Sequence, residues 1–132
     1  MKLSKNFTLS ELTRTNLRLP NEPNCEEIGR LRTLCEKVLQ PLRDLYGKPI
    51  TVNSGFRGEL VNKAVGGVPT SQHRLGEAVD ITAGNKSENK KLYDLIANNL
   101  EFDQLINEYD YSWIHVSFTT RKPNRKQELK IG

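Results

Sequence analysis

The feature that most constrains the fold is a long amphipathic helix pattern between Asn24 and Gly47. Asn24 is a favourable N-cap, and two glutamates follow it in the first turn, where negative charge suits the helix dipole. Pro41 should kink this helix and Gly47 should end it. The apolar positions recur every three or four residues and predict one broad buried stripe, made of Ile28, Leu31, Leu34, Cys35, Val38, Leu39, Leu42 and Leu45.

Shorter elements surround this helix in the sequence. Thr8 and Glu11 form a capping-box pattern that predicts a short helix near the N-terminus. Two further helices are expected, at Glu59–Val65 and, capped by Ser87, at Glu88–Asn99. Short strands are expected at residues 50–52, 77–83, 104–107 and 113–118. Helices followed by a small sheet with helical insertions predict an α+β fold, and 132 residues suit a single domain over 1–132.

The charge of the chain is concentrated at its C-terminal end. Residues 121–132 carry a net charge of +4, which is the net charge of the whole chain, so the remainder is neutral. Such a basic end suits a solvated tail or contact with an anionic polymer, and it does not favour a nucleic-acid-binding domain. No apolar run reaches the roughly 18 residues of a membrane span, so no membrane insertion is expected. Cys25 and Cys35 lie ten residues apart on one helix and cannot form a disulfide there.

Two predicted strands each place a polar side chain opposite an aliphatic face. In residues 78–82, Asp80 points away from Val79 and Ile81, and in residues 113–118, His115 points away from Ile114 and Val116. His73 precedes the first of these strands, and Gly76 can supply the bend that brings His73 over Asp80. Two histidines and one aspartate with an open fourth position are typical of a catalytic zinc site. Surface or core roles are the alternative for each residue taken alone.

The sequence around these residues resembles the M15 zinc peptidases. Ser54-Gly55-Phe56-Arg57 matches SGxR, residues 71–80 match SxHxxGxAxD, and residues 113–117 match WxHxS, in the family's order and spacing. The similarity extends from about residue 6 to residue 129. The family includes D-alanyl-D-alanine carboxypeptidases and phage peptidoglycan endopeptidases, and its fold resembles the hedgehog domain. The resemblance implies a small antiparallel sheet with N-terminal helices packed against it.

The resemblance also assigns roles to individual residues. His73, Asp80 and His115 correspond to the zinc ligands, and one Zn²⁺ per chain is expected. Arg57 corresponds to the arginine that faces the substrate, although a structural pair with a carboxylate is the alternative. Ser71, Gln72 and Ser117 are candidates for substrate binding, with a loop-structuring role favoured for Ser71.

The general base is less clearly marked than the ligands. Many relatives have a carboxylate three residues before the last histidine, but Ser112 occupies that position here. Glu108 matches an arrangement in which the glutamate ends the preceding strand, so it is the expected base, with Asp110 as the reserve. A solvated role is the alternative for a carboxylate in such a turn.

The resemblance implies a zinc peptidase that cleaves a bond involving a D-amino acid in bacterial peptidoglycan. Carboxypeptidase and endopeptidase activity both remain open, and the bond that is cut is not specified. A non-catalytic zinc-containing module that binds cell-wall peptide is the alternative, supported by Ser112. The N-terminus lacks the apolar region of a secretory signal. We therefore expect a protein that is made in the cytoplasm and acts at the cell wall in phage or prophage release. It is also expected to be a monomer.

Overall fold

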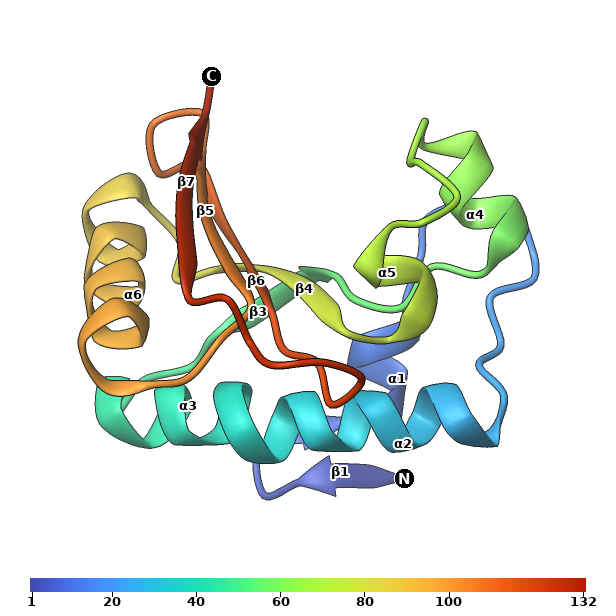
Figure 1. Cartoon of the computed structure of the whole chain (residues 1–132), viewed down its shortest axis with the longest axis horizontal. Helices are drawn as coiled ribbons and strands as arrows, with labels where there is room; N and C mark the ends of the chain where they lie inside the picture. The colour runs from blue at the N-terminus through green and yellow to red at the C-terminus, as the bar shows by residue number, and fades with distance from the viewer.

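A five-stranded sheet occupies the centre of the molecule, with helices on both sides (Figure 1). The computed structural model describes residues 1–132. In spatial order the strands are β3 (Thr51–Ser54), β4 (Ala78–Thr82), β6 (Trp113–Ser117), β5 (Gln104–Glu108) and β7 (Gln127–Ile131). The first four pair with one another in antiparallel fashion, whereas β7 runs parallel to its neighbour β5. The α+β architecture is confirmed, and β7 is the one departure from the expected antiparallel sheet.

The predicted long helix is present as three consecutive segments that run beneath the sheet (Figure 1). These are α2 (Cys25–Leu34), the π-helical turn η1 (Cys35–Leu39) and α3 (Gln40–Tyr46), which ends at Gly47. Pro41 has no N–H and its ring crowds the carbonyl one turn earlier, so the regular α-helical pattern cannot continue through it. The wider turn before Pro41, closed by a bond from the Gln40 N–H to the Cys35 carbonyl, accommodates this.

The π turn also corrects the predicted buried stripe. An extra residue in the turn rotates everything that follows it around the helix axis. Leu42 remains fully buried, but Leu45 is 50% exposed and does not belong to the core. The other positions of the stripe pack as expected, with Leu31, Leu34, Cys35, Val38 and Leu39 fully buried and Ile28 against the edge of the core.

The remaining elements follow local capping signals. The N-terminal hairpin of β1 (Lys2–Ser4) and β2 (Phe7–Thr8) leads into α1 (Leu9–Thr13), where the Thr8–Glu11 capping box is present as predicted. The helix α4 spans Glu59–Ala64. In α6 (Lys86–Asn99) the N-cap is Asn85 and not Ser87, because the Asn85 carboxamide accepts from the Glu88 N–H. The helix α5 (Gln72–Leu75), a single turn between two loops, was not predicted from the sequence.

The segments α2, η1 and α3 together form one continuous rod, the α2–α3 rod. The core lies between this rod and the sheet. It is one connected cluster of 21 buried hydrophobic residues, to which β4 contributes Val79 and Ile81 and β6 contributes Ile114 and Val116. The polar residues of these two strands are therefore displayed on the opposite face of the sheet, as strand alternation predicted. None of the helices combines the length and the apolar character needed to cross a membrane.

Candidate functional site

Asp80 and His115 lie side by side on the face of the sheet that points away from the α2–α3 rod. Asp80 on β4 is directly opposite His115 on β6 in the antiparallel register. On the other side of β6, Ile106 is paired with His115, which places the aspartate and the histidine near the middle of the sheet. Side chains that are paired across neighbouring strands are close enough to share a ligand.

His73 reaches the same place from α5. The Ser71 hydroxyl accepts from the His73 N–H and caps this short helix, which agrees with the structuring role predicted for Ser71. Gly76 ends α5 with φ of 82° and turns the chain into β4. A Cβ at this position would lie 2.8 Å from the Glu27 carbonyl oxygen, so both the backbone angle and the close approach of α2 require glycine. Gly76 thus supplies the predicted bend.

The three side chains converge on one point. Asp80 Oδ1 lies 2.9 Å from His115 Nδ1 and 3.4 Å from His73 Nε2, and candidate ligand atoms from all three residues lie within 4.8 Å of one another. His73 Nδ1 lies 2.8 Å from the Gly55 carbonyl oxygen, so this nitrogen is assigned the proton. The unprotonated Nε2 then faces the carboxylate with its lone pair. Two electron-pair donors facing each other in a buried position fit a shared cation.

The environment keeps Asp80 ionised. Burial alone would raise the pKa of the Asp80 carboxyl group, but its close contacts with the His115 and His73 rings hold it well below its usual range. Asp80 Oδ2 also lies 3.4 Å from the Arg57 guanidinium. Arg57 Nε donates to the Ser54 hydroxyl, which fixes the side chain against the end of β3. The ion pair between Arg57 and a carboxylate, which was the alternative role for this residue, is therefore present. The Arg57 side chain also lines a cavity.

The register of β5 and β6 places Glu108 on the same face as His115. Glu108 is directly opposite Trp113, which lies two residues before His115 on β6. The Trp113 indole N–H donates to Glu108 Oε2 at 3.0 Å and orients the carboxylate. Asp110 lies in the following turn, where its side chain is exposed and 3.8 Å from the Lys86 ammonium. Glu108, and not Asp110, therefore lines the same cavity as the candidate metal ligands.

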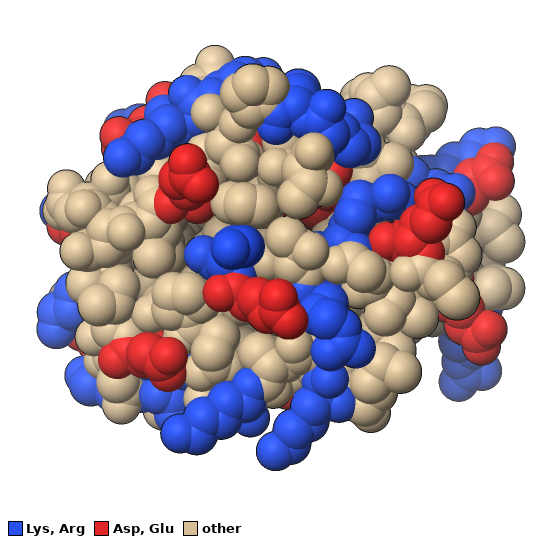
Figure 2. Space-filling model, turned by 60° about the horizontal axis from the view of Figure 1, so that its bottom comes forward, with Lys and Arg blue, Asp and Glu red and all other residues tan.

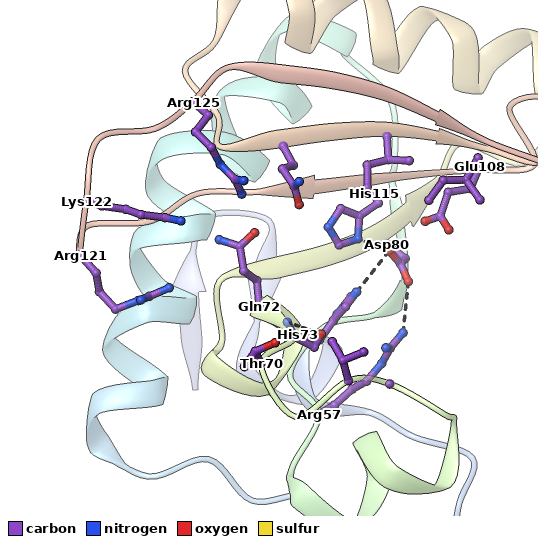
Figure 3. Close-up of a pocket in the computed structure, with 16 residues that line it drawn as sticks. Arg57, Thr70, Gln72, His73, Asp80, Glu108, His115, Arg121, Lys122 and Arg125 are labelled. Carbon is purple, nitrogen blue, oxygen red and sulfur yellow. Dashed lines mark hydrogen bonds and ion pairs between the residues drawn. The ribbon is translucent and has the colours of Figure 1, made fainter.

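These residues line a cavity of about 620 Å³ (Figure 3). His73, Asp80 and His115 form part of its floor, and Arg57 and Glu108 lie beside them. Among the other predicted residues, Ser71 and Gln72 also line the cavity. Ser117 does not: it is fully buried, and its hydroxyl accepts from the Gln104 N–H.

The basic C-terminal end is not the solvated tail that was expected. Arg121 donates through two nitrogens to the carboxylate of Glu77, which is 1% exposed, and Arg125 does the same to the fully buried Asp103. The following residues form β7 on the edge of the sheet. Two buried carboxylates require compensating charge, so the arginines are part of the fold.

Gln72 connects these ion pairs to the candidate metal site. Its side-chain amide donates to both Glu77 and Asp103, and the next residue in the chain is His73. Despite burial, the hydrogen bonds to Arg121, Gln72 and Thr119 lower the pKa of the Glu77 carboxyl group. Neither of the two buried acids, Glu77 and Asp103, was predicted from the sequence. The available signal was a charged residue beside each apolar strand together with the excess of arginine and lysine near the C-terminus.

This α+β fold, with two histidines and an aspartate lining one cavity, has the donor set of a candidate divalent-metal site, as in metal-dependent enzymes. The chain matches the peptidase M15 family over residues 5–117 and belongs to that family. The family resemblance expected from the sequence motifs is thereby confirmed.

A curated relative is also similar in sequence. Over 83 residues the chain is 40% identical to a zinc D-Ala-D-Ala carboxypeptidase of Streptomyces albus G. The aligned region covers 61% of this chain and 32% of the relative, so the chain spans about a third of the length of that protein.

Proposed function

We propose that the chain is a zinc-dependent peptidase that cleaves a peptide bond involving a D-amino acid in bacterial peptidoglycan. The observation that carries the proposal is the convergence of His73, Asp80 and His115 at the bottom of a cavity that also contains Glu108 and Arg57. Membership of the peptidase M15 family supports the reaction class, and the carboxypeptidase relative supports zinc and the substrate.

One zinc ion per chain would be held by His73, Asp80 and His115. The donor set suits zinc, which prefers imidazole nitrogen and carboxylate oxygen, and the Gly55 carbonyl orients the His73 ring from outside the ligand set. Zinc bound there supplies Lewis acidity, which polarises a carbonyl group and makes water more acidic.

The protein residues supply orientation and proton transfer. Glu108 accepts the proton of the attacking water and passes it to the leaving amine, while the Trp113 indole keeps its carboxylate directed into the cavity. Arg57 stabilises negative charge on the substrate, either a carboxylate or the oxyanion that develops at the scissile carbonyl. Its contact with Asp80 holds the guanidinium in position before the substrate arrives.

Digestion of defined muropeptides, with products identified by mass, tests this function. Release of terminal D-Ala indicates a carboxypeptidase, and an internal cut indicates an endopeptidase. His73→Ala and Asp80→Ala should each lose most of the roughly one zinc per chain expected for the wild type. Full zinc content in both variants would show that the ligand assignment is wrong.

The same digest separates the enzyme from a binding module. A protein that binds zinc and muropeptides but releases no product would be the non-catalytic alternative. The position of Glu108 in the cavity favours the enzyme, because it supplies the carboxylate that Ser112 cannot. Assays on intact cell walls extend the test to the proposed action in phage or prophage release.

A further inference from the structure

The side of the cavity farthest from Glu108 is basic. Figure 3 shows Arg121, Lys122 and Arg125 on one side of the cavity and Glu108 on the other, with the candidate metal ligands between them. Figure 2 shows that lysine and arginine side chains also occur on the outer surface, some of them beside acidic ones. Three of the four arginine and lysine residues that line the cavity therefore lie at the end opposite Glu108.

The three basic residues are not equivalent. Arg121 and Arg125 each make a bidentate ion pair with a buried carboxylate, so most of their charge is already compensated. Lys122 lies between them in sequence, lines the cavity and makes no ion pair. Its ammonium group is therefore the cation at this end of the cavity that is free to bind a ligand.

The loop that carries Lys122 is held rigidly. The Asn124 carboxamide accepts from the Thr119 N–H and donates to the Thr119 carbonyl, which closes the loop at its base. The Thr119 hydroxyl accepts from the Arg121 N–H and donates to Glu77. Pro123 further restricts the backbone next to Lys122. A cation presented on a preorganised loop loses less entropy when it binds an anion.

We propose that Lys122 is a specificity-determining residue that recognises a second carboxylate on the peptide substrate, away from the scissile bond. This inference rests on the proposed peptidase function and narrows its substrate class to acidic peptides. A carboxylate is the anionic group that a peptide itself provides. Arg121 and Arg125 act as positioning residues, because they hold the loop and contribute the remainder of the local positive potential.

The test uses pairs of peptides ending in D-Ala-D-Ala that differ only in one acidic residue, presented as a free carboxylate or as its carboxamide. This residue is placed one, two or three positions from the scissile bond. For at least one position, the wild-type kcat/KM should be about tenfold higher for the carboxylate, as expected for one charged contact. Lys122→Gln should reduce this ratio to about one, and Lys122→Arg should retain most of it.

Lys130→Gln is the matched control, because Lys130 is an exposed lysine of the same C-terminal segment that does not line the cavity. Lys130→Gln should keep the wild-type ratio of kcat/KM for the carboxylate and carboxamide peptides. The wild-type protein should also keep this ratio when the buffer ion is changed. If Lys122→Gln still prefers the carboxylate peptide, the proposal is overturned. Equal cleavage of both peptides of every pair by the wild type would also overturn it. In that case the peptidase function would still stand.

If the wild type cleaves no peptide, the peptidase function fails and the carboxylate site is tested by calorimetric binding of the same pairs to the zinc-loaded protein. Tighter binding of the carboxylate that is lost in Lys122→Gln supports the site. Equal binding of both peptides overturns it.

Discussion

Asp80 contacts three neighbouring side chains through its two oxygens. Oδ1 faces both histidines and Oδ2 faces Arg57, so the candidate ligand set and the position of the Arg57 guanidinium both depend on one carboxylate. At the scale of single residues, the proposed chemistry is divided between atoms that would hold the metal and atoms that would act on the substrate. Substitutions at Glu108 and Arg57 address the second group.

Glu108→Gln should lower hydrolysis about 100-fold or more, because the amide cannot accept a proton from water. Zinc content should stay near the wild-type value, since Glu108 is not in the proposed ligand set. Asp110→Asn should be close to neutral, because Asp110 is exposed and lies outside the cavity. Hydrolysis rates and metal analysis check both variants, and loss of activity in Asp110→Asn with normal activity in Glu108→Gln would reverse the assignment of the base.

Arg57→Lys should reduce turnover more than it reduces the melting temperature. Lysine keeps the positive charge but lacks the planar fork that reaches Ser54, Asp80 and a substrate anion at once. Steady-state kinetics beside thermal unfolding of the zinc-loaded protein measure the two effects. A variant that loses stability in proportion to activity would instead identify Arg57 as a structural partner of Asp80.

At the scale of elements, the C-terminal segment is fixed to the sheet by ion pairs that respond to acid. Hydrogen bonds from Arg125 lower the pKa of Asp103 from 3.8 to about 2, against the opposing effect of burial. A lowered pKa in the folded state means that the ionised carboxylate stabilises the fold above its unfolded pKa. This contribution is lost as the pH falls from about 4 toward 2.

Asp103→Asn should therefore flatten the dependence of unfolding free energy on pH between about 4 and 2. Urea titrations at several pH values measure this dependence. Asp110→Asn, at an exposed position, should keep the wild-type slope. An unchanged slope in Asp103→Asn would show that the Arg125 pair does not contribute to acid stability.

The turn between β5 and β6 is held in an uncommon conformation. Tyr109, Asp110 and Tyr111 all have φ between 52° and 61°, in the left-handed region that non-glycine residues rarely adopt. The buried Asn89 of α6 donates to the carbonyls of Tyr111 and Ser112. It also accepts from the Ala83 N–H at the end of β4 and so ties the turn to the sheet.

Asn89→Ala should destabilise the protein by about 2 kcal/mol, because it leaves several partly buried backbone groups without a partner. Asn99→Ala on the same helix should change stability by only a few tenths, since Asn99 is exposed. Equilibrium urea unfolding of both variants checks this difference. Equal stabilities of the two variants would contradict the role assigned to Asn89.

At the scale of the whole molecule, local patterns predicted the elements better than they predicted the contacts between them. Strand alternation correctly placed Asp80 and His115 on one face, and the capping signals correctly marked α1 and α2. The β7 strand was missed because its residues are exposed and mostly polar, and only pairing with β5 makes them a strand.

Pairing between segments also explains what the sequence pattern could not determine. The face on which Glu108 lies depends on its pairing with Trp113 across a left-handed turn, which strand alternation within one segment cannot reveal. The structural role of Arg121 and Arg125 depends on acids that lie 44 and 22 residues away in the sequence. A net charge assigned to a terminal segment says nothing about such partners.

Removal and return of zinc tests the central claim most directly. Protein freed of metal with a chelator, which is then dialysed away, should have lost hydrolysis of a muropeptide ending in D-Ala-D-Ala. Titration with zinc should restore the wild-type rate at about one equivalent per chain, and Asp80→Ala should not recover under the same conditions. Full hydrolysis by the metal-free protein, or full recovery of Asp80→Ala at one equivalent, would contradict the proposed zinc peptidase.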